Sequence, residues 1–152
     1  MDKGRIAILK AEMQVQIGEI DKIYTKLEER RREKGRAGIE STGYQLHNLY
    51  CAFEDLFKIA ADAFENHIQD ESQYHIELLR RMTMSIEEVR PPLLSTESYQ
   101  LLDALRAFRH FFRHAYTYEL DERKVRIVLE DAIKLRELYR QDIERFLDSF
   151  EE

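Results

Sequence analysis

Apolar residues recur at spacings of three and four from one end of the chain to the other, and almost nothing interrupts them. Such spacing places apolar side chains along one side of an α-helix. The 152 residues include only five Gly and two Pro, the residues that usually mark the turns between strands. We therefore expect an all-α protein, and we exclude an all-β or a doubly wound α/β fold.

The few interruptions divide the chain into four long helices and one short helix. The first apolar stripe runs from Ile6 to Leu27 and ends in a mixed charge run, and Gly35 and Gly38 mark the turn that follows. The clearest break is Val89-Arg90-Pro91-Pro92, because proline lacks an amide hydrogen and restricts the residue before it. Asp121 is a candidate N-cap for the last helix. The remaining helices are expected at about 40–67, 74–84, 96–116 and 122–150. We expect them to pack as antiparallel neighbours in a single domain over residues 1–152.

Composition narrows the class of protein further. The chain carries 24 Lys and Arg against 30 Asp and Glu, a formal net charge of −6, which argues against a general nucleic-acid coat protein. No apolar run is long enough to span a membrane, and the N-terminal residues lack the apolar core of a signal peptide, so we expect a cytoplasmic protein. The single cysteine, Cys51, allows no internal disulfide and no multi-cysteine zinc site. Its place on or beside an apolar helix face favours a buried structural thiol.

One stretch departs from the acidic composition. Residues 104–118 contain no carboxylate, and a polyanion would be attracted to such a surface. The stretch carries three arginines and two histidines, which are Arg106, Arg109, Arg113, His110 and His114. Residues four apart share a helix face, which pairs Arg109 with Arg113 and His110 with His114. Arg109 and His114 are about 140° apart around the helix. A long arginine side chain can still reach the pocket of the imidazole, and two such helices from two protomers could also converge on one site.

These residue types suit the cleavage of RNA without a metal. A histidine with a pKa near neutrality can take the proton from a ribose 2′-hydroxyl, and a second histidine can protonate the leaving 5′-oxygen. A planar guanidinium can bind the phosphate oxygens in a bidentate way while negative charge develops on them. The expected products are a 2′,3′-cyclic phosphate and a 5′-hydroxyl.

Other roles for the same residues have to be weighed against this one. Cations near a helix C-terminus also complement the helix dipole, and an Arg followed five residues later by a His arises easily by chance. His110 and His114 have the spacing of two metal ligands, but no further ligand is in sight, and no His follows a Glu by three residues as in di-iron bundles. The sequence contains no Gly-rich phosphate loop and no Gly-x-Ser-x-Gly elbow. The charge run at residues 28–36 mixes basic with acidic residues, which favours a solvated helix end over a nucleic-acid arm.

The stretch Arg109-His110-Phe111-Phe112-Arg113-His114-Ala115-Tyr116 resembles the signature of HEPN-domain ribonucleases, which is Arg, a polar residue, three further residues and His. The Tyr two places after the His resembles the HepT toxin branch of that family. Leu49–Leu56 looks like the family's second helix, and Tyr74–Leu79 is similar to its Trp-His segment, with Tyr74 in place of Trp. With the Arg-Pro-Pro break before the motif, the resemblance covers about residues 5–148.

The resemblance implies a HEPN-like helical bundle that dimerises through the region of the motif helix, so that two motif helices meet in one RNA-binding cleft. It implies that Arg109 and His114 are the catalytic pair and that His110 supports them. It also implies that neither a metal nor another cofactor is needed. Arg113 and Arg106 have no fixed role in the pattern, and we interpret them from the residues alone as RNA contacts.

The resemblance also implies a partner protein. HepT-type toxins are usually encoded beside an MntA-like minimal nucleotidyltransferase antitoxin, which can transfer AMP to the motif Tyr, and by that match Tyr116 is the acceptor. A bulky anion near the cleft would repel RNA. The predicted function is that of a toxin of a type VII-like toxin–antitoxin module that acts as a metal-independent RNA endonuclease. Nothing in the residues chooses between tRNA and mRNA as the target.

Two other functions stay open at this point. The chain could be a non-catalytic helical partner that helps a nucleotidyltransferase bind its substrate. It could also be a dimeric scaffold whose Arg and His cluster only stabilises the interface. Buried cations would then need carboxylate partners, which Glu54 or Asp55 could supply.

Overall fold

The structure is a computed structural model that describes residues 2–64, 73–117 and 119–151. Within them the chain forms five α-helices, which are α1 (Lys3–Arg30), α2 (Gly35–Phe64), α3 (Tyr74–Arg81), α4 (Thr96–Arg113) and α5 (Glu122–Asp148). A short 3-10 turn, η2 (Ala115–Thr117), follows α4, and the described residues contain no strand beyond one isolated β-bridge between Ile86 and Arg90. In this part of the chain no helix is both long and apolar enough to cross a bilayer. The expected fold class, an all-α bundle of four long helices and a short one, is confirmed.

The turn between α1 and α2 needs one glycine, not two. Gly35 has a φ of 81°, in the left-handed region that favours Gly, and α2 begins there instead of near Glu40. Gly38 lies inside α2, where an added Cβ would come within 2.8 Å of the Cβ of Glu33. The close approach of Glu33, rather than a turn, therefore explains Gly38. The expected end of this helix near His67 lies outside the described residues.

Three later helices end earlier than the sequence indicates, and one of them is α5, which ends at Asp148 although Phe150 is expected in it. α3 ends at Arg81 instead of Met84. α4 ends at Arg113 instead of Tyr116, because His114 leaves the helical region with φ −108° and ψ 9°. The amide of His114 still donates hydrogen bonds to carbonyls of the last turn, so it caps the helix. The Arg- and His-rich motif therefore extends across a helix end.

The start of α5 is fixed by its N-cap and by contacts with the segment after α1. Asp121 is the N-cap of α5, as predicted, and its carboxylate accepts a hydrogen bond from the amide of Arg123 at 2.9 Å. Arg126 donates hydrogen bonds to the carbonyls of Arg31 and Glu33, just beyond the end of α1. Residues 28–36 are exposed except for the partly buried Arg30, as expected for a solvated helix end.

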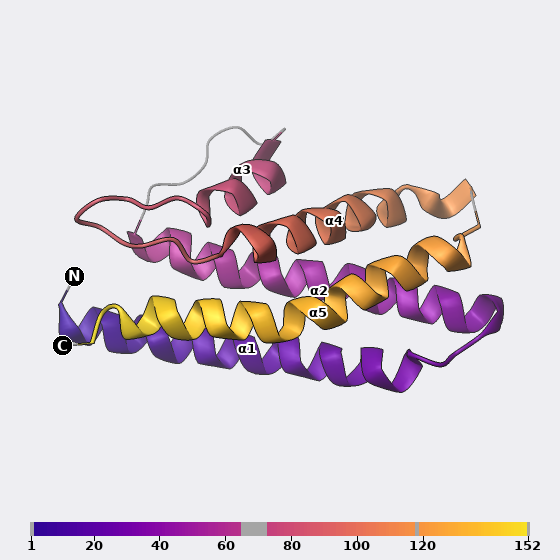
Figure 1. The fold of residues 1–152 in the computed structure, drawn as a ribbon, viewed down its shortest axis with the longest axis horizontal. Coiled ribbons are helices and arrows are strands. Elements are labelled where there is room, and N and C mark those ends of the chain that lie inside the picture. The colour runs from indigo at the N-terminus through magenta and orange to yellow at the C-terminus, as the bar shows by residue number, and fades with distance from the viewer. Residues whose placement is uncertain (1, 65–72, 118, 152) are drawn as a thin grey trace.

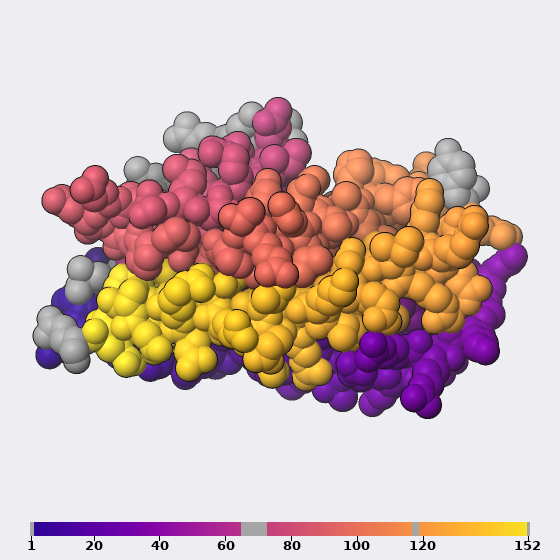
Figure 2. All heavy atoms as spheres, viewed as in Figure 1, coloured from indigo at the N-terminus to yellow at the C-terminus, as the bar shows by residue number. Residues whose placement is uncertain are grey.

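The four long helices lie along one another, and α2 packs against each of the other α-helices (Figure 1). Both chain termini lie at one end of the bundle. The other end brings together the end of α1, the start of α2, the end of α4 and the start of α5 (Figure 1). On the face shown in Figure 2, α4 and α5 lie side by side and cover much of the surface. The Arg- and His-rich end of α4 is therefore far from the termini.

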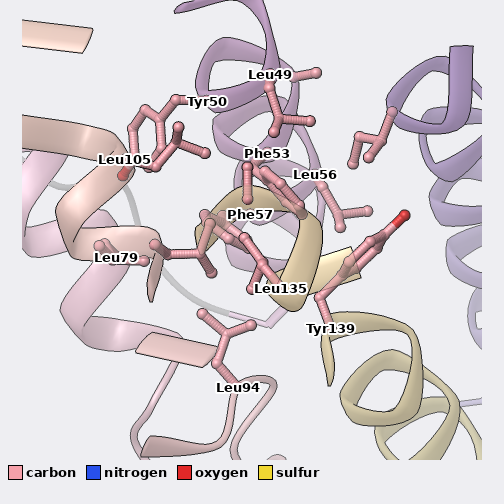
Figure 3. Close-up of a cluster of buried hydrophobic side chains, with 14 of the residues drawn as sticks. Leu49, Tyr50, Phe53, Leu56, Phe57, Leu79, Leu94, Leu105, Leu135 and Tyr139 are labelled. Carbon is pink, nitrogen blue, oxygen red and sulfur yellow. The ribbon is translucent and has the colours of Figure 1, made fainter. Parts of the chain in front are cut away.

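The core centres on the aromatic face of α2. The ring of Phe53 is fully buried and meets the ring of Tyr139 edge-on, with 4.9 Å between centroids. The Tyr24 ring is stacked on that of Tyr139, 6.3 Å away, and the Tyr24 hydroxyl donates a hydrogen bond to the carbonyl of Ala132. Figure 3 shows further members of this cluster, among them Leu49, Leu56, Phe57, Leu79, Leu105 and Leu135. Aromatic rings bury large apolar areas, so this cluster joins α1, α2 and α5 strongly.

The connection into α4 is ordered by two polar side chains. The guanidinium of Arg90, in a residue only 4% exposed, donates hydrogen bonds to backbone carbonyls that include those of Arg81 and Met84. Ser95 is the N-cap of α4, and the carboxylate of Asp142 on α5 accepts hydrogen bonds from both its amide and its hydroxyl. These contacts fix where α4 begins and hence where its C-terminal end lies.

Replacement of Phe53 by Ala should destabilise the bundle by about 3–5 kcal/mol, because it leaves a cavity between three helices. Urea denaturation followed by circular dichroism measures this free energy. Val15→Ala is the control, since Val15 is 70% exposed on α1 and should change the free energy of unfolding by no more than about 0.5 kcal/mol. Equal effects of the two substitutions would contradict a close-packed centre at Phe53.

Candidate functional site

The six residues singled out by the sequence lie at the end of α4 or directly after it. Arg106, Arg109, His110 and Arg113 belong to the last turns of α4, His114 is its C-cap and Tyr116 lies in η2. Arg106 and Arg109 are half-buried, whereas Arg113 and both histidines are exposed. Tyr116 is 89% exposed. The structure therefore gathers the predicted residues at one end of the bundle.

Within this group the arginine and histidine side chains make different contacts. The rings of His110 and His114 lie 4.8 Å apart between centroids in a T-shaped arrangement, so these two residues share a side of α4, as their spacing indicates. Arg109 turns toward α2, where its Nε donates a hydrogen bond to the Sγ of Cys51 at 3.3 Å. Among the described residues no hydrogen bond joins Arg109 to His114. Arg109 and His114 are therefore neighbours along the motif without a direct hydrogen bond.

The three arginines differ in how their charge is balanced. Arg106 forms an ion pair with Asp103, one turn earlier on α4, with 2.9 Å between Nη2 and Oδ1. Neither Arg109 nor Arg113 forms an ion pair within the part of the chain that the structure describes. Of these three arginines, Arg109 and Arg113 therefore provide the positive charge that no carboxylate balances.

The carboxylates of α2 bind elsewhere. Glu54, only 3% exposed, accepts a hydrogen bond from Nδ1 of His75 at 2.6 Å, and Asp55 lies 3.8 Å from the Nζ of Lys58. The scaffold alternative offers Glu54 or Asp55 as a partner for Arg109, and neither of them pairs with it. Arg109 is instead held by an uncharged group.

Sequence reasoning misses the contribution of α2 to this site. The sequence favours a buried thiol at Cys51, but Cys51 is only partly buried and accepts the hydrogen bond from Arg109. His47, one turn earlier, places its Nε2 3.9 Å from the same sulfur and packs its ring against Phe112 of α4, with 5.4 Å between centroids. His47 and Cys51 are four residues apart at the border of the apolar face of α2. That spacing is the signal that could have identified them.

The environment of His47 favours its neutral form. Burial lowers the pKa of the imidazole below its ordinary value, and the positive charges of Arg109 and Arg113 lower it further. A hydrogen bond between Nδ1 of His47 and Oδ1 of Asn48, at 3.4 Å, acts in the opposite direction. The lowered pKa favours the neutral imidazole of His47 at neutral pH.

The chemistry available at this end of α4 is anion binding combined with proton transfer. Guanidinium groups such as those of Arg109 and Arg113 bind phosphate oxygens, and imidazole is the side chain most often used for acid–base chemistry. Among the described residues, no group of three or more His, Cys, Asp or Glu side chains is arranged to hold a metal ion.

The opposite flank of α4 is apolar. A cavity of about 510 Å³ lies between α4 and α5, lined by apolar side chains that include Phe108, Leu120 and Val128. Phe111 and Ile127 also line it and are 45% and 62% exposed. None of the six predicted site residues contributes to this cavity. α4 therefore separates a cationic side, next to α2, from an apolar side, next to α5.

Arg113→Ala should raise the pKa of His47 toward its ordinary value, because it removes one of the two positive charges that disfavour the imidazolium. A pH titration followed by NMR of the histidine ring protons measures this pKa. Arg106→Ala is the matched control, since Arg106 is paired with Asp103 and is not among the charges that act on His47. No shift in the Arg113 variant, or the same shift in both variants, would contradict the arrangement.

A comparison with known protein families agrees with this architecture. The family model described as HepT-like protein matches residues 41–150, from the first turns of α2 to just beyond the end of α5. The match includes all six candidate residues and leaves out α1, so it is narrower than the resemblance over residues 5–148. No curated protein and no solved structure matches the chain. Because the family model covers well over half of the sequence, the chain belongs to the HepT-like family.

Proposed function

We propose that the chain is a metal-independent RNA endonuclease that acts as the toxin of a toxin–antitoxin module. The observation that carries this proposal is the pair Arg109 and Arg113, which have no carboxylate partner among the described residues, next to the paired and exposed imidazoles of His110 and His114. Guanidinium groups bind phosphate, and imidazoles titrate in the range that proton transfer at neutral pH requires. Membership of the HepT-like family supports the same function.

In the proposed reaction His114 takes the proton of a ribose 2′-hydroxyl, and the 2′-oxygen attacks the adjacent phosphorus. Arg109 binds the non-bridging oxygens while negative charge accumulates on them. The bond from phosphorus to the 5′-oxygen breaks, and the leaving oxygen takes a proton from a second imidazole. His110, whose ring contacts that of His114, supports the catalytic pair, and Arg113 and Arg106 bind neighbouring phosphates. The products are a 2′,3′-cyclic phosphate and a 5′-hydroxyl.

The active form in this proposal is a homodimer. Arg109 turns toward α2 while the His114 side chain is exposed, so motif helices from two protomers can together supply the phosphate-binding and proton-transferring groups. Phe111 on the other flank of α4 and Ile127 on α5 are also exposed, and association of two copies there would remove apolar surface from water.

Tyr116 is proposed as the site at which an MntA-like nucleotidyltransferase antitoxin silences the toxin. Its side chain is 89% exposed, so the hydroxyl is accessible to another enzyme. The Tyr116 oxygen would attack the α-phosphorus of ATP, lose its proton and displace pyrophosphate. The added phosphate lies two residues from His114 in the chain, and its negative charge would repel the RNA backbone.

Purified, unmodified protein should cleave RNA in EDTA and leave 2′,3′-cyclic phosphate ends. His114→Ala and Arg109→Ala should each lower the rate by about 100-fold or more, because they remove the base and the phosphate-binding group. Arg123→Ala is the matched arginine control, since its side chain is 91% exposed at the start of α5 and should not affect the rate. Cleavage that survives both substitutions would contradict the proposal. A wild-type protein that does not cleave RNA and carries no modification would favour a non-catalytic partner of a nucleotidyltransferase.

Incubation with an MntA-like nucleotidyltransferase and ATP should increase the intact mass of the protein by one adenylyl group and abolish cleavage. Tyr116→Phe removes the acceptor oxygen and should prevent the modification. Tyr44→Phe is the matched control, because Tyr44 is 55% exposed on α2 and lies outside the motif. Intact-mass and peptide mass spectrometry measure both results, and adenylylation of the Tyr116 variant would refute the assignment.

A further inference from the structure

The α2 side of the site contains a row of uncharged polar groups that leads to Arg109. The Nε of Arg109 donates a hydrogen bond to the Sγ of Cys51 at 3.3 Å. The same sulfur lies 3.9 Å from Nε2 of His47, and Nδ1 of His47 lies 3.4 Å from Oδ1 of Asn48. Three contacts therefore connect one catalytic candidate on α4 with three residues close together on α2.

One set of proton positions satisfies all three contacts. Oδ1 of Asn48 is an acceptor, so Nδ1 of His47 carries the ring proton and Nε2 is free to accept. The S–H of Cys51 then donates to Nε2, and the sulfur lone pairs accept the Nε–H of Arg109. This assignment requires a neutral imidazole and a protonated thiol.

An uncharged acceptor affects Arg109 differently from a carboxylate. A carboxylate would bind the guanidinium more strongly, but it would also cancel the charge that attracts a phosphate. The thiol engages only Nε, and Arg109 forms no other hydrogen bond with the described residues. Both Nη groups are therefore available for two oxygens of one phosphate, while the side chain is already held in place.

We propose that Cys51 and His47 are positioning residues, which hold the Arg109 guanidinium through the row Asn48–His47–Cys51 with its Nη groups directed at the scissile phosphate. This inference rests on the proposed RNA cleavage for its functional meaning. The hydrogen bonds of the row can be measured without any RNA, so the positioning of Arg109 and the cleavage of RNA can each be refuted without refuting the other.

The row depends on the protonation of His47. The charged and polar groups that face this imidazole are Arg109 and Arg113 from α4 and Asn48 and Cys51 from α2. Burial and the two arginines lower the pKa of His47, so the ring is neutral and the row intact at neutral pH. As the pH falls below that pKa, Nε2 gains a proton and can no longer accept from the thiol.

The first arm of the test follows the Nε–H of Arg109 in the protein alone. Its resonance in a ¹⁵N-arginine NMR spectrum is assigned by its disappearance in Arg109→Lys. Cys51→Val, which has a similar volume but no acceptor, should speed the exchange of this proton with water by about three- to tenfold. Cys51→Ser retains an acceptor and should exchange nearly as slowly as the wild type. Unchanged exchange in the Val variant would overturn the proposal.

The second arm measures kcat and KM for RNA cleavage. Cys51→Val and His47→Leu should lower kcat about three- to tenfold with little change in KM, whereas Cys51→Ser and His47→Gln should restore most of the rate because both retain an acceptor oxygen. In an Arg109→Lys background, Cys51→Val should cause no further loss, since no Nε–H remains to be held. A further loss of the same size there would indicate a purely structural role and overturn the proposal. An unmodified wild type that does not cleave RNA overturns the proposed function, and the exchange rate of the Arg109 Nε–H then tests the positioning of Arg109 by itself.

Discussion

Burial of the broad apolar face of α2 is the constraint on which the rest of the molecule depends. This helix contacts all four other α-helices, and its Phe53 meets aromatic rings from α1 and α5. The apolar face of α2 is bordered by partly buried residues, which include Asn48. His47 and Cys51 lie at that border, and the packing of α4 against α2 brings Arg109 to the same place. The candidate site therefore follows from the packing of the core.

The helices could be predicted from the sequence because a spacing of three and four residues is local information. Helix ends could not be predicted as well. No Gly or Pro lies between Arg113 and Tyr116, so the pattern continues through His114, although the backbone leaves the helix there. Gly38 is the opposite case. It looks like a turn residue in the sequence, but it lies inside α2, where the close approach of Glu33 leaves no room for a Cβ. In both cases contacts with neighbouring segments decide the conformation.

The α4 half of the site could also be predicted from the sequence, because its Arg and His residues are close together in the motif. The α2 half could not, since Arg109 and Cys51 are 58 positions apart and nothing local connects them. The usual roles of cysteine and arginine also point away from a contact between them. A lone cysteine beside an apolar face suggests packing, and a partner for arginine is ordinarily sought among carboxylates such as Glu54. The observed partner is a thiol, and Glu54 binds His75 instead.

Because α4 ends at Arg113, one part of the motif lies in the helix and the other part lies beyond it. Arg109 belongs to a helix that is packed on two sides, whereas Tyr116 lies beyond the helix with its side chain almost entirely in water. A large group joined to the Tyr116 oxygen would displace only solvent, so the bundle could carry it without repacking. Attachment and removal of such a group would leave the same folded protein each time. Inhibition at this position could therefore be reversed as fast as the covalent bond is cleaved, with no refolding step in between.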